Sequence, residues 1–468
     1  MISAQEELGA GKIGKILWKY SLPAIVGMMV SSAYNIISRV FVGQTEGMLA
    51  LSGVAVAYPV NIIIIAFSML ITIGATALIS IKLGEKNPED AERIIGTSFV
   101  ALIAISLILV FFIVLFLEPV LRLLGATDDI MPFAKEFMIF SLLGIPFIGL
   151  GYGMNNFIRA AGNPRKAMVT QIVGAIVSVG LTALLVYVLR LGVKGAALAA
   201  VCAQALAAAL VLQHLLSPRS GSALRLRLKY IRIEPRLLRG ILSVGVAPFA
   251  AQAAASLVLI FFNNRLKIYG GDAAIAAYAA INGIMMVLVM PVMGMAQGVQ
   301  PIVGFNFGAR KYDRVKKAEY SAMMIATLMT ILGFLLAELF PQTLIRFFGG
   351  DESFTGMGVH GLRVFMAMYA FVGMQIMGSQ YFQATGRGAV ALVLTLTRQC
   401  IFLLPALFIL PYFFGLQGIW LAGPVSDTFA GVVTMILFAR DMKRLSREQR
   451  LLNDGGRNSE AKSEINQL

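Results

Sequence analysis

The sequence predicts an all-α integral membrane protein whose twelve transmembrane helices form two pseudo-symmetric six-helix bundles. Three observations predict this fold: the composition, a succession of long apolar stretches, and a repeat of half the chain. Of the 468 residues, 58% are hydrophobic and only 13% are charged. Soluble proteins are about 45–50% apolar and about 25% charged. The composition therefore excludes a soluble multidomain enzyme.

Twelve apolar stretches are long enough to cross a bilayer, which takes about 20 residues per helix. Some are apolar on every side, as helices that face lipid are. Others carry Gly, Pro, Asn and Ser, which a bilayer tolerates only where neighbouring helices or a water-filled cavity satisfy the backbone. The expected spans are 16–38, 51–81, 94–117, 132–158, 167–189, 195–215, 238–264, 274–306, 318–340, 359–385, 389–411 and 418–439.

The charges predict the orientation of these spans. Most of the 39 Lys and Arg residues lie in segments on the side of the two chain ends, among them Arg159, Arg165 and Lys166 after the fourth span. Cationic loops stay on the cytoplasmic side of a membrane, so both termini are expected in the cytoplasm. We interpret the net charge of +15 as this topology signal and as attraction to anionic lipid headgroups. No nucleic-acid partner is expected, because no motif that reads bases is present.

The chain is a duplicated unit. Three motifs recur at one constant offset, close to half the chain length: Leu83-Gly84 as Phe307-Gly308, Arg122-Leu-Leu-Gly125 as Arg346-Phe-Phe-Gly349, and Phe157-Ile-Arg-Ala-Ala-Gly162 as Tyr381-Phe-Gln-Ala-Thr-Gly386. A half with six spans returns the chain to its starting side, so the repeat is parallel. Transporters with parallel repeats hold their substrate near the bilayer midplane, between two bundles that rock against each other. The expected units are an N-terminal lobe (1–215), a basic cytoplasmic linker (216–237) whose alternation resembles a strand or an interface-hugging segment, a C-terminal lobe (238–440) and a polar cytoplasmic tail (441–468).

Several stretches resemble the multidrug and toxic compound extrusion (MATE) family of the multidrug/oligosaccharidyl-lipid/polysaccharide exporter superfamily. They are Ser21-Leu-Pro23 with Tyr34-Asn35-Ile-Ile-Ser38-Arg39, Arg159-Ala-Ala-Gly162-Asn, and Gly415-Leu-Gln-Gly418-Ile-Trp-Leu-Ala with Pro424-Val-Ser-Asp427. The resemblance covers nearly the whole chain. It implies a V-shaped pair of lobes in the inner (cell) membrane of a prokaryote. It also implies export of organic, often cationic compounds in exchange for H⁺ or Na⁺.

The chain departs from the family pattern where the resemblance implies coupling acids. The family commonly has an acid where this chain has Ser38, and an Asn and an Asp where it has Ser178 and Thr182. Neutral hydroxyls can contribute oxygens to a sodium ion, but they do not titrate near neutral pH. The sequence therefore leaves the choice between H⁺ and Na⁺ open.

Asp427 is the only acid that the sequence places well inside a span, and Arg398 in the eleventh span is the matching lone cation. An ionisable residue within the membrane is expensive and marks a functional site by default. We expect the two to form a buried couple that drives the conformational change, or else a static ion pair that joins two helices. In the other lobe, Gln204 stands at the position of Asp427.

Amides and methionines inside the spans are candidates for the substrate cavity, although amides equally serve as hydrogen-bonding links between helices. Methionine suits a pliable, promiscuous pocket. The candidates are Asn35, Asn155, Asn156, Gln171, Gln252, Asn263, Asn264, Asn282, Met286, Met290, Gln375 and Gln380.

Other chemistries are not indicated. The chain has no phosphate loop of the ATPase type, and His214 and His360 lack metal-ligand spacing, so neither catalysis, a metal nor a cofactor beyond the coupling ion is expected. We expect a monomeric secondary transporter that meets small organic substrates and membrane lipids. Two alternatives stay open: a related flippase of a lipid-linked or other amphiphilic substrate, which cations such as Arg39 and Arg265 would favour, and a passive channel.

Overall fold

The computed structural model describes residues 4–217, 224–349 and 352–465, apart from the side chains of 4, 35–36, 39–40, 42–48, 51, 353 and 455–465. All regular elements of these residues are helices. The N-lobe, which precedes the linker, contains α1 (Ala4–Ala10), α2 (Ile13–Gly84), α3 (Pro88–Leu115), α4 (Leu117–Leu123), α5 (Met131–Leu142), α6 (Ile145–Phe147), η1 (Ile148–Gly153), α7 (Asn155–Ala160), α8 (Pro164–Thr182), η2 (Ala183–Val188) and α9 (Gly192–Leu216).

The C-lobe follows a linker that carries one short helical turn, η3 (Leu228–Tyr230). It contains α10 (Pro235–Gly308), α11 (Tyr312–Leu339), α12 (Pro341–Arg346), α13 (Glu352–Met366), α14 (Tyr369–Ala384), α15 (Gly388–Leu396), η4 (Thr397–Leu403), α16 (Leu404–Phe414) and α17 (Leu416–Ile465).

The number of membrane spans follows from helix lengths. Among the described residues, nine helices are long and apolar enough to cross a membrane, or up to eleven if each of two bent pairs counts as one span. Helix α10 has 74 residues and turns at Gly271, whose φ of 65° and ψ of −162° are not helical. At about 1.5 Å per residue it is far longer than one bilayer. Counted as two spans, α10 brings the total to the expected twelve.

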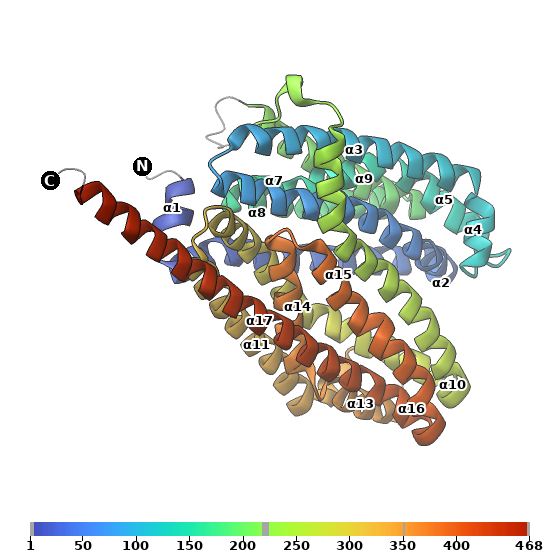
Figure 1. Cartoon of the computed structure of the whole chain (residues 1–468). Coiled ribbons are helices and arrows are strands. Elements are labelled where there is room, and N and C mark those ends of the chain that lie inside the picture. Colours follow the sequence, from blue (N-terminus) through green and yellow to red (C-terminus); the bar gives the residue numbers. More distant parts are fainter. Residues whose placement is uncertain (1–3, 218–223, 350–351, 466–468) are drawn as a thin grey trace.

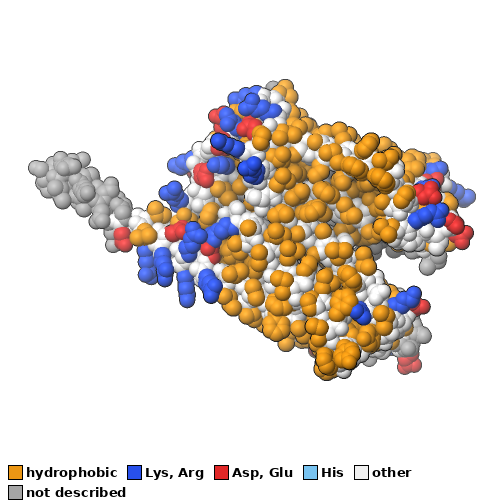
Figure 2. Space-filling view, turned by 45° about the vertical axis from the view of Figure 1, so that its right-hand side comes forward, with side chains coloured by type: hydrophobic (Ala, Val, Ile, Leu, Met, Phe, Trp, Pro, Cys, Tyr) orange, Lys and Arg blue, Asp and Glu red, His pale blue; other side chains and the backbone are white. Residues whose placement is uncertain are grey.

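The lobes form a V (Figure 1). They converge at the end of the molecule where both chain termini lie, here called the terminal end, and diverge at the opposite end, here called the cleft end. Figure 2 shows an apolar band across both lobes with charged side chains at its two ends, and a notch between the lobes at the cleft end. The all-helical, two-lobed membrane fold expected from the sequence is confirmed.

The duplication is also visible in the backbone. Gly125 and Gly349 have φ values of 99° and 77°, and Gly162 and Gly386 have φ values of 97° and 77°. The members of each pair are repeat equivalents, because the same offset in the chain separates them. Side chains other than that of Gly disfavour this left-handed region. The repeated motifs therefore recur because both lobes need the same left-handed turns.

The two lobes meet where α2 crosses α10, the most extensive contact between any two elements. A Cβ atom added at Gly84 would lie 2.0 Å from the carbonyl oxygen of Phe305, and one added at Gly308 would lie 2.1 Å from that of Ile81. These two contacts are repeat equivalents of each other. Small residues let backbones approach this closely within a membrane. The glycines therefore allow the close packing that closes the terminal end of the V.

Two single spans expected from the sequence are bent. The span expected at 132–158 is built from Met131–Leu142 and Ile145–Ala160, which meet at 53°, and the one expected at 359–385 from Phe354–Met366 and Tyr369–Ala384, which meet at 49°. The two bends are equivalent in the repeat. Hydropathy averages over a window and does not register a change of axis, which is why the sequence showed one straight span in each place.

The linker and the tail also differ in detail from expectation. The described part of the linker is not a strand: the Tyr230 hydroxyl donates to Glu89 at 2.9 Å and Arg227 pairs with Glu92 at 2.7 Å, so the linker packs on α3. The expected tail from residue 441 continues α17, which is helical from the last span to Ile465. The proposed division into lobes, linker and tail otherwise stays a prediction.

The glycine crossing predicts a large difference between two Gly→Ala substitutions. A Cβ atom at Gly245 would lie 1.7 Å from the carbonyl oxygen of Leu70, whereas one at Gly180 would meet nothing within 4 Å. Gly245→Ala is expected to destabilise the protein by about 3 kcal/mol, the upper range for overpacking, because a backbone carbonyl cannot move aside. Gly180→Ala is the matched control and should leave stability unchanged or slightly raised. Thermal unfolding in detergent checks this, and equal midpoints would contradict the crossing.

Candidate functional site

The strongest candidate site in the C-lobe is the ion pair between Arg398 and Asp427. Arg398 Nε donates to Asp427 Oδ1 at 2.7 Å, and the exposed fractions of the two side chains are 27% and 3%. The neighbouring Ser426 hydroxyl donates to the carbonyl oxygen of Arg398 at 2.8 Å. The structure thus brings together the two residues that the sequence paired, from η4 and α17. Their role in coupling stays a prediction.

Local backbone geometry positions this pair. Arg398 lies on η4, a π-helical turn within the eleventh span, and π-bulges in helices are frequent at functional sites. Tyr369 and Tyr278 interact electrostatically with Arg398, and the Tyr278 ring stacks on Phe262 with centroids 4.4 Å apart. The phenolic groups of Tyr278 and Tyr369 therefore lie within electrostatic reach of the guanidinium.

The N-lobe coupling candidates contain no comparable pair among the described side chains. Ser178 and Thr182 are 2% and 1% exposed, and the Thr182 hydroxyl donates to the carbonyl oxygen of Ser178 at 2.7 Å. Ser38 is half-buried on α2. Gln204, half-buried on α9, holds its Oε1 atom 2.5 Å from the place of a Cβ on Gly144. In the described residues, no three His, Cys, Asp or Glu side chains are grouped to hold a metal ion.

The buried amides act partly as links between helices. Asn155 is fully buried, and its Nδ2 donates to the carbonyl oxygen of Ala167 at 3.0 Å. Asn156 accepts from Arg159 at 2.8 Å. Gln171 and Gln375 are 8% and 5% exposed, and the Oε1 atom of each has no hydrogen-bond partner within the described structure. The Oδ1 atom of Asn155 lacks a partner there as well. The three residues with unused amide oxygens are the better cavity candidates of this set, because such buried oxygens are costly to leave unpaired.

The remaining cavity candidates are more accessible. Gln252, Asn263, Met290 and Gln380 are half-buried, whereas Asn264, Asn282 and Met286 are exposed. An amide turned toward lipid would lose its hydrogen bonds to water. Only a water-filled cleft satisfies such groups, so we expect Asn264 and Asn282 to face the notch. The side chain of Asn35 lies outside the described residues, as does that of Arg39, and the guanidinium of Arg265 stacks over the Phe408 ring at 4.1 Å.

Arg159 was expected among the cytoplasmic loop cations, and that prediction is wrong. It is 1% exposed and joins the lobes: its Nη1 donates to Gln297 Oε1 at 2.9 Å. Its Nε and Nη2 atoms have no partner among the described residues. The repeat held a signal for this, because Arg159 is equivalent to the neutral Gln383 in an otherwise similar motif. A cation that replaces a neutral repeat equivalent merits attention.

A second buried acid, which the sequence did not single out, lies near the start of the ninth span and not well inside it. Glu319 in α11 is fully buried, and neither of its carboxylate oxygens has a hydrogen-bond partner in the described structure. Glu319 follows a run of basic residues, which is typical of a membrane surface. Helical spacing from the buried residues Val315, Ala318 and Ala322 places it on the apolar face of α11, and that periodicity could have revealed it.

The terminal end of the V is closed by further contacts between the lobes. Lys311 of the C-lobe donates to the carbonyl oxygen of Gly9 at 2.8 Å, and Arg314 Nη2 donates to those of Leu8 at 3.0 Å and Gly11 at 2.8 Å. Basic side chains near the carboxyl end of a helix satisfy its last carbonyl groups. The C-lobe therefore holds the end of α1 and closes the molecule opposite the cleft.

The Arg398 and Asp427 pair predicts a large stability cost for removing either charge. Arg398→Gln and Asp427→Asn are each expected to destabilise the protein by about 3 kcal/mol, the lower range for a buried pair since Arg398 is partly exposed, and the double variant by less than the sum. Arg363→Gln with Glu338→Gln is the matched control, an exposed pair worth at most about 1 kcal/mol. A double-mutant cycle on unfolding checks this, and additive effects at Arg398 and Asp427 would contradict it.

Comparison with known proteins agrees with the two lobes. The MatE family model matches the chain twice, over residues 23–184 and 247–409, one match within each lobe. The multidrug export protein MepA of Staphylococcus aureus (strain N315) is 24% identical over 423 residues, which cover 90% of this chain and 93% of MepA.

Solved structures give the same result. The MATE multidrug transporter DinF-BH, solved as a complex, is 35% identical with a TM-score of 0.87 and covers 94% of this chain and 98% of that chain. A MOP superfamily transporter from Pyrococcus furiosus, described as having a binding pocket of reverse polarity, shares the fold with a TM-score of 0.89 at 23% identity, covering 94% and 98%. With the family model matched in both halves, this multi-pass membrane protein belongs to the MatE family.

Proposed function

We propose that the protein is a secondary active multidrug efflux transporter that exports organic, mainly cationic and amphiphilic compounds. The observation that carries this proposal is the 35% identity, over 94% of this chain, to the MATE multidrug transporter DinF-BH. The MepA relatives are multidrug export proteins, which supports the same substrate class. The notch between the lobes (Figure 2) gives such compounds an exit between two bundles, on the side opposite the chain termini.

The proposed mechanism is alternating access. In the structure the cleft end is open and the terminal end is closed by the α2 crossing with α10, by Arg159 with Gln297 and by Lys311 with Gly9. Export from the cytoplasm requires the opposite state, in which these contacts part. Apart from the helix crossing, these contacts are single hydrogen bonds, each worth about 1 kcal/mol net. A rocking motion can therefore break them together. A closed end also disfavours a passive channel.

We assign coupling to Asp427 with Arg398. An ion or substrate shifts the balance between two states only if it binds them with different affinity. A carboxylate 3% exposed, whose partner is a single guanidinium, provides such a difference, because a bound proton, Na⁺ or cationic substrate competes with Arg398 for it. Ser178 and Thr182 can add only neutral oxygens, which suits Na⁺ and not H⁺.

The proposed setting is the inner (cell) membrane of a prokaryote, with both termini in the cytoplasm and the protein working as a monomer. No cofactor is proposed beyond the coupling ion. A second candidate function, a flippase of an anionic amphiphile, is favoured by one observation: Arg159 is buried between the lobes with no carboxylate partner among the described residues. In a state open at the terminal end, that guanidinium would suit a phosphate or carboxylate group.

Transport in proteoliposomes tests the proposal. Ethidium accumulation in inside-out vesicles is expected under either a pH gradient or a Na⁺ gradient, and Asp427→Asn should lower the initial rate about tenfold or more, because a neutral amide does not exchange a cation. Glu338→Gln, which removes an exposed acid, is the control and should transport normally.

Either of two outcomes would contradict this scheme. Full gradient-driven transport by Asp427→Asn would reduce the ion pair to a static link between helices. Folded wild-type protein that moves no ethidium under either gradient, but moves a fluorescent anionic lipid between leaflets, would replace the exporter by the flippase.

A further inference from the structure

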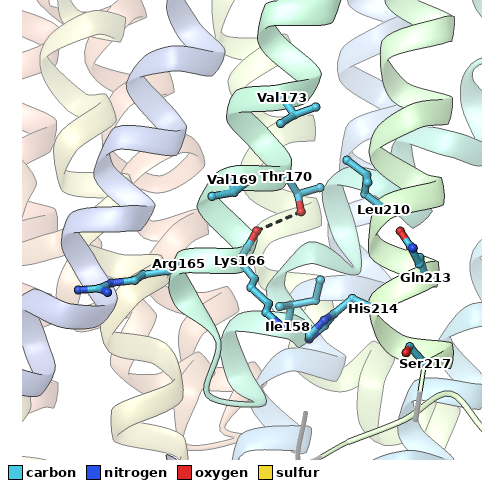
Figure 3. A pocket seen from close by; sticks show the side chains of 10 residues that line it. All are labelled: Ile158, Arg165, Lys166, Val169, Thr170, Val173, Leu210, Gln213, His214 and Ser217. Carbon is cyan, nitrogen blue, oxygen red and sulfur yellow. Dashed lines mark hydrogen bonds between the residues drawn. The ribbon is translucent and has the colours of Figure 1, made fainter. Parts of the chain in front are cut away.

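A second site lies on the N-lobe, away from the cleft. A cavity of about 490 Å³ opens between α8 and α9, close to where α9 ends and the linker begins. Figure 3 shows the Lys166 side chain running toward His214 at one end of this cavity, and Val169, Val173 and Leu210 along its length. The cavity therefore has a basic end and an apolar wall.

The basic end of the cavity has cations in its lining and no acid. Arg165 and Lys166 both line the cavity, whereas no described Asp or Glu does. Of the described acids, none forms an ion pair with Arg165. The Nε2 atom of His214 is buried and lacks a hydrogen-bond partner in the described structure. In Figure 3 the Arg165 side chain points away from His214, so an anion at the unused ring nitrogen of His214 would meet the charge of Lys166.

The backbone adds to this preference. Arg165 and Lys166 are among the first residues of the 19-residue helix α8, whose N-cap residue Asn163 makes no side-chain capping bond. The amino end of a helix carries a partial positive charge, which disfavours cations there and attracts anions. This uncapped amino end of α8 therefore favours an anion.

The repeat provides an internal comparison. A cavity of about 250 Å³ in the C-lobe is lined by Phe382, Val390 and Leu437. In the repeat, these three are the equivalents of Ile158, Lys166 and His214, which line the N-lobe cavity. The two cavities are therefore the same feature of the repeated unit.

The C-lobe cavity contains its own anion. Asp441 pairs with Arg387 and accepts a hydrogen bond from Tyr381. No described acid lines the N-lobe cavity. The C-lobe cavity thus has a carboxylate beside its cations, and the described lining of the N-lobe cavity has none.

We propose that the cavity between α8 and α9 binds an anionic phospholipid. The phosphate lies at Lys166 and His214, with Arg165 adding positive charge nearby at the start of α8, and an acyl chain lies along Val169, Val173 and Leu210. The lipid, and not a free phosphate, is the occupant because the apolar wall runs on into exposed apolar surface: Val169 is 52% and Ile176 is 65% exposed. Basic pockets between transmembrane helices on the cytoplasmic side are suited to such headgroups.

Native mass spectrometry of the full-length protein in detergent, titrated with phosphatidylglycerol or phosphatidylcholine, tests the proposal. Wild type is expected to retain phosphatidylglycerol preferentially. Arg165→Ala with Lys166→Ala should weaken its binding roughly thirtyfold. Arg236→Ala with Arg239→Ala is the matched control, because it removes two exposed cations from α10 that lie outside the cavity lining, and it should bind as wild type does.

A second variant retains every cation. Ser217→Asp gives the N-lobe cavity the carboxylate that the C-lobe cavity has, and it is expected to lower phosphatidylglycerol binding while leaving phosphatidylcholine binding unchanged. Equal binding by wild type, the Arg165 and Lys166 variant and Ser217→Asp would overturn the proposal. So would displacement of the lipid by millimolar inorganic phosphate alone, since the site would then be a plain anion site with no place for the acyl chain.

Discussion

The close crossing of α2 with α10 is the constraint on which the rest of the structure depends. Where Gly84 meets Phe305 and Gly308 meets Ile81, the backbones lie closer than any side chain at those glycines would allow. Lipid is as apolar as the helix surfaces, so association relies on close packing and not on hydrophobic burial. Fixing the two lobes at one end is what leaves a cleft at the other. The crossing is therefore the main contact between the lobes in this state.

The sequence was sufficient for the fold because membrane helices are long, apolar and, in this chain, duplicated. The Asp427 contact with Arg398 was also predictable, since two lone charges in neighbouring apolar spans have few other partners. Arg159 was misplaced and Glu319 was overlooked for one reason: both lie near span ends, where composition does not distinguish a buried side chain from a solvated one. The bends between the halves of the fourth and tenth spans were missed because hydropathy carries no information about direction.

The lobes share a backbone plan but differ in chemistry. The C-lobe holds two of its acids in buried pairs, Asp427 with Arg398 and Asp441 with Arg387. At the position of Asp427 the N-lobe has the neutral Gln204. A duplicated unit keeps the residues that the turns and crossings need, because both copies must fold, whereas charged residues can be lost from one copy if the other suffices. The proposed division of labour, with coupling in one lobe and lipid contact on the other, follows this asymmetry.

The unbroken helix α17 has a mechanical consequence. It carries Asp427 within the membrane and continues along α11, where Ser446 accepts from Lys316 at 3.1 Å and Gln449 accepts from the backbone of Tyr312 at 3.0 Å. From Asp427 to Asn453 the helix is about 39 Å long, at about 1.5 Å per residue. A rigid rod of that length turns a tilt of about 10° at the ion pair into about 7 Å at its far end. The C-terminal helix thus acts as a lever arm: a small rotation at the ion pair becomes a larger displacement of the helix end outside the membrane.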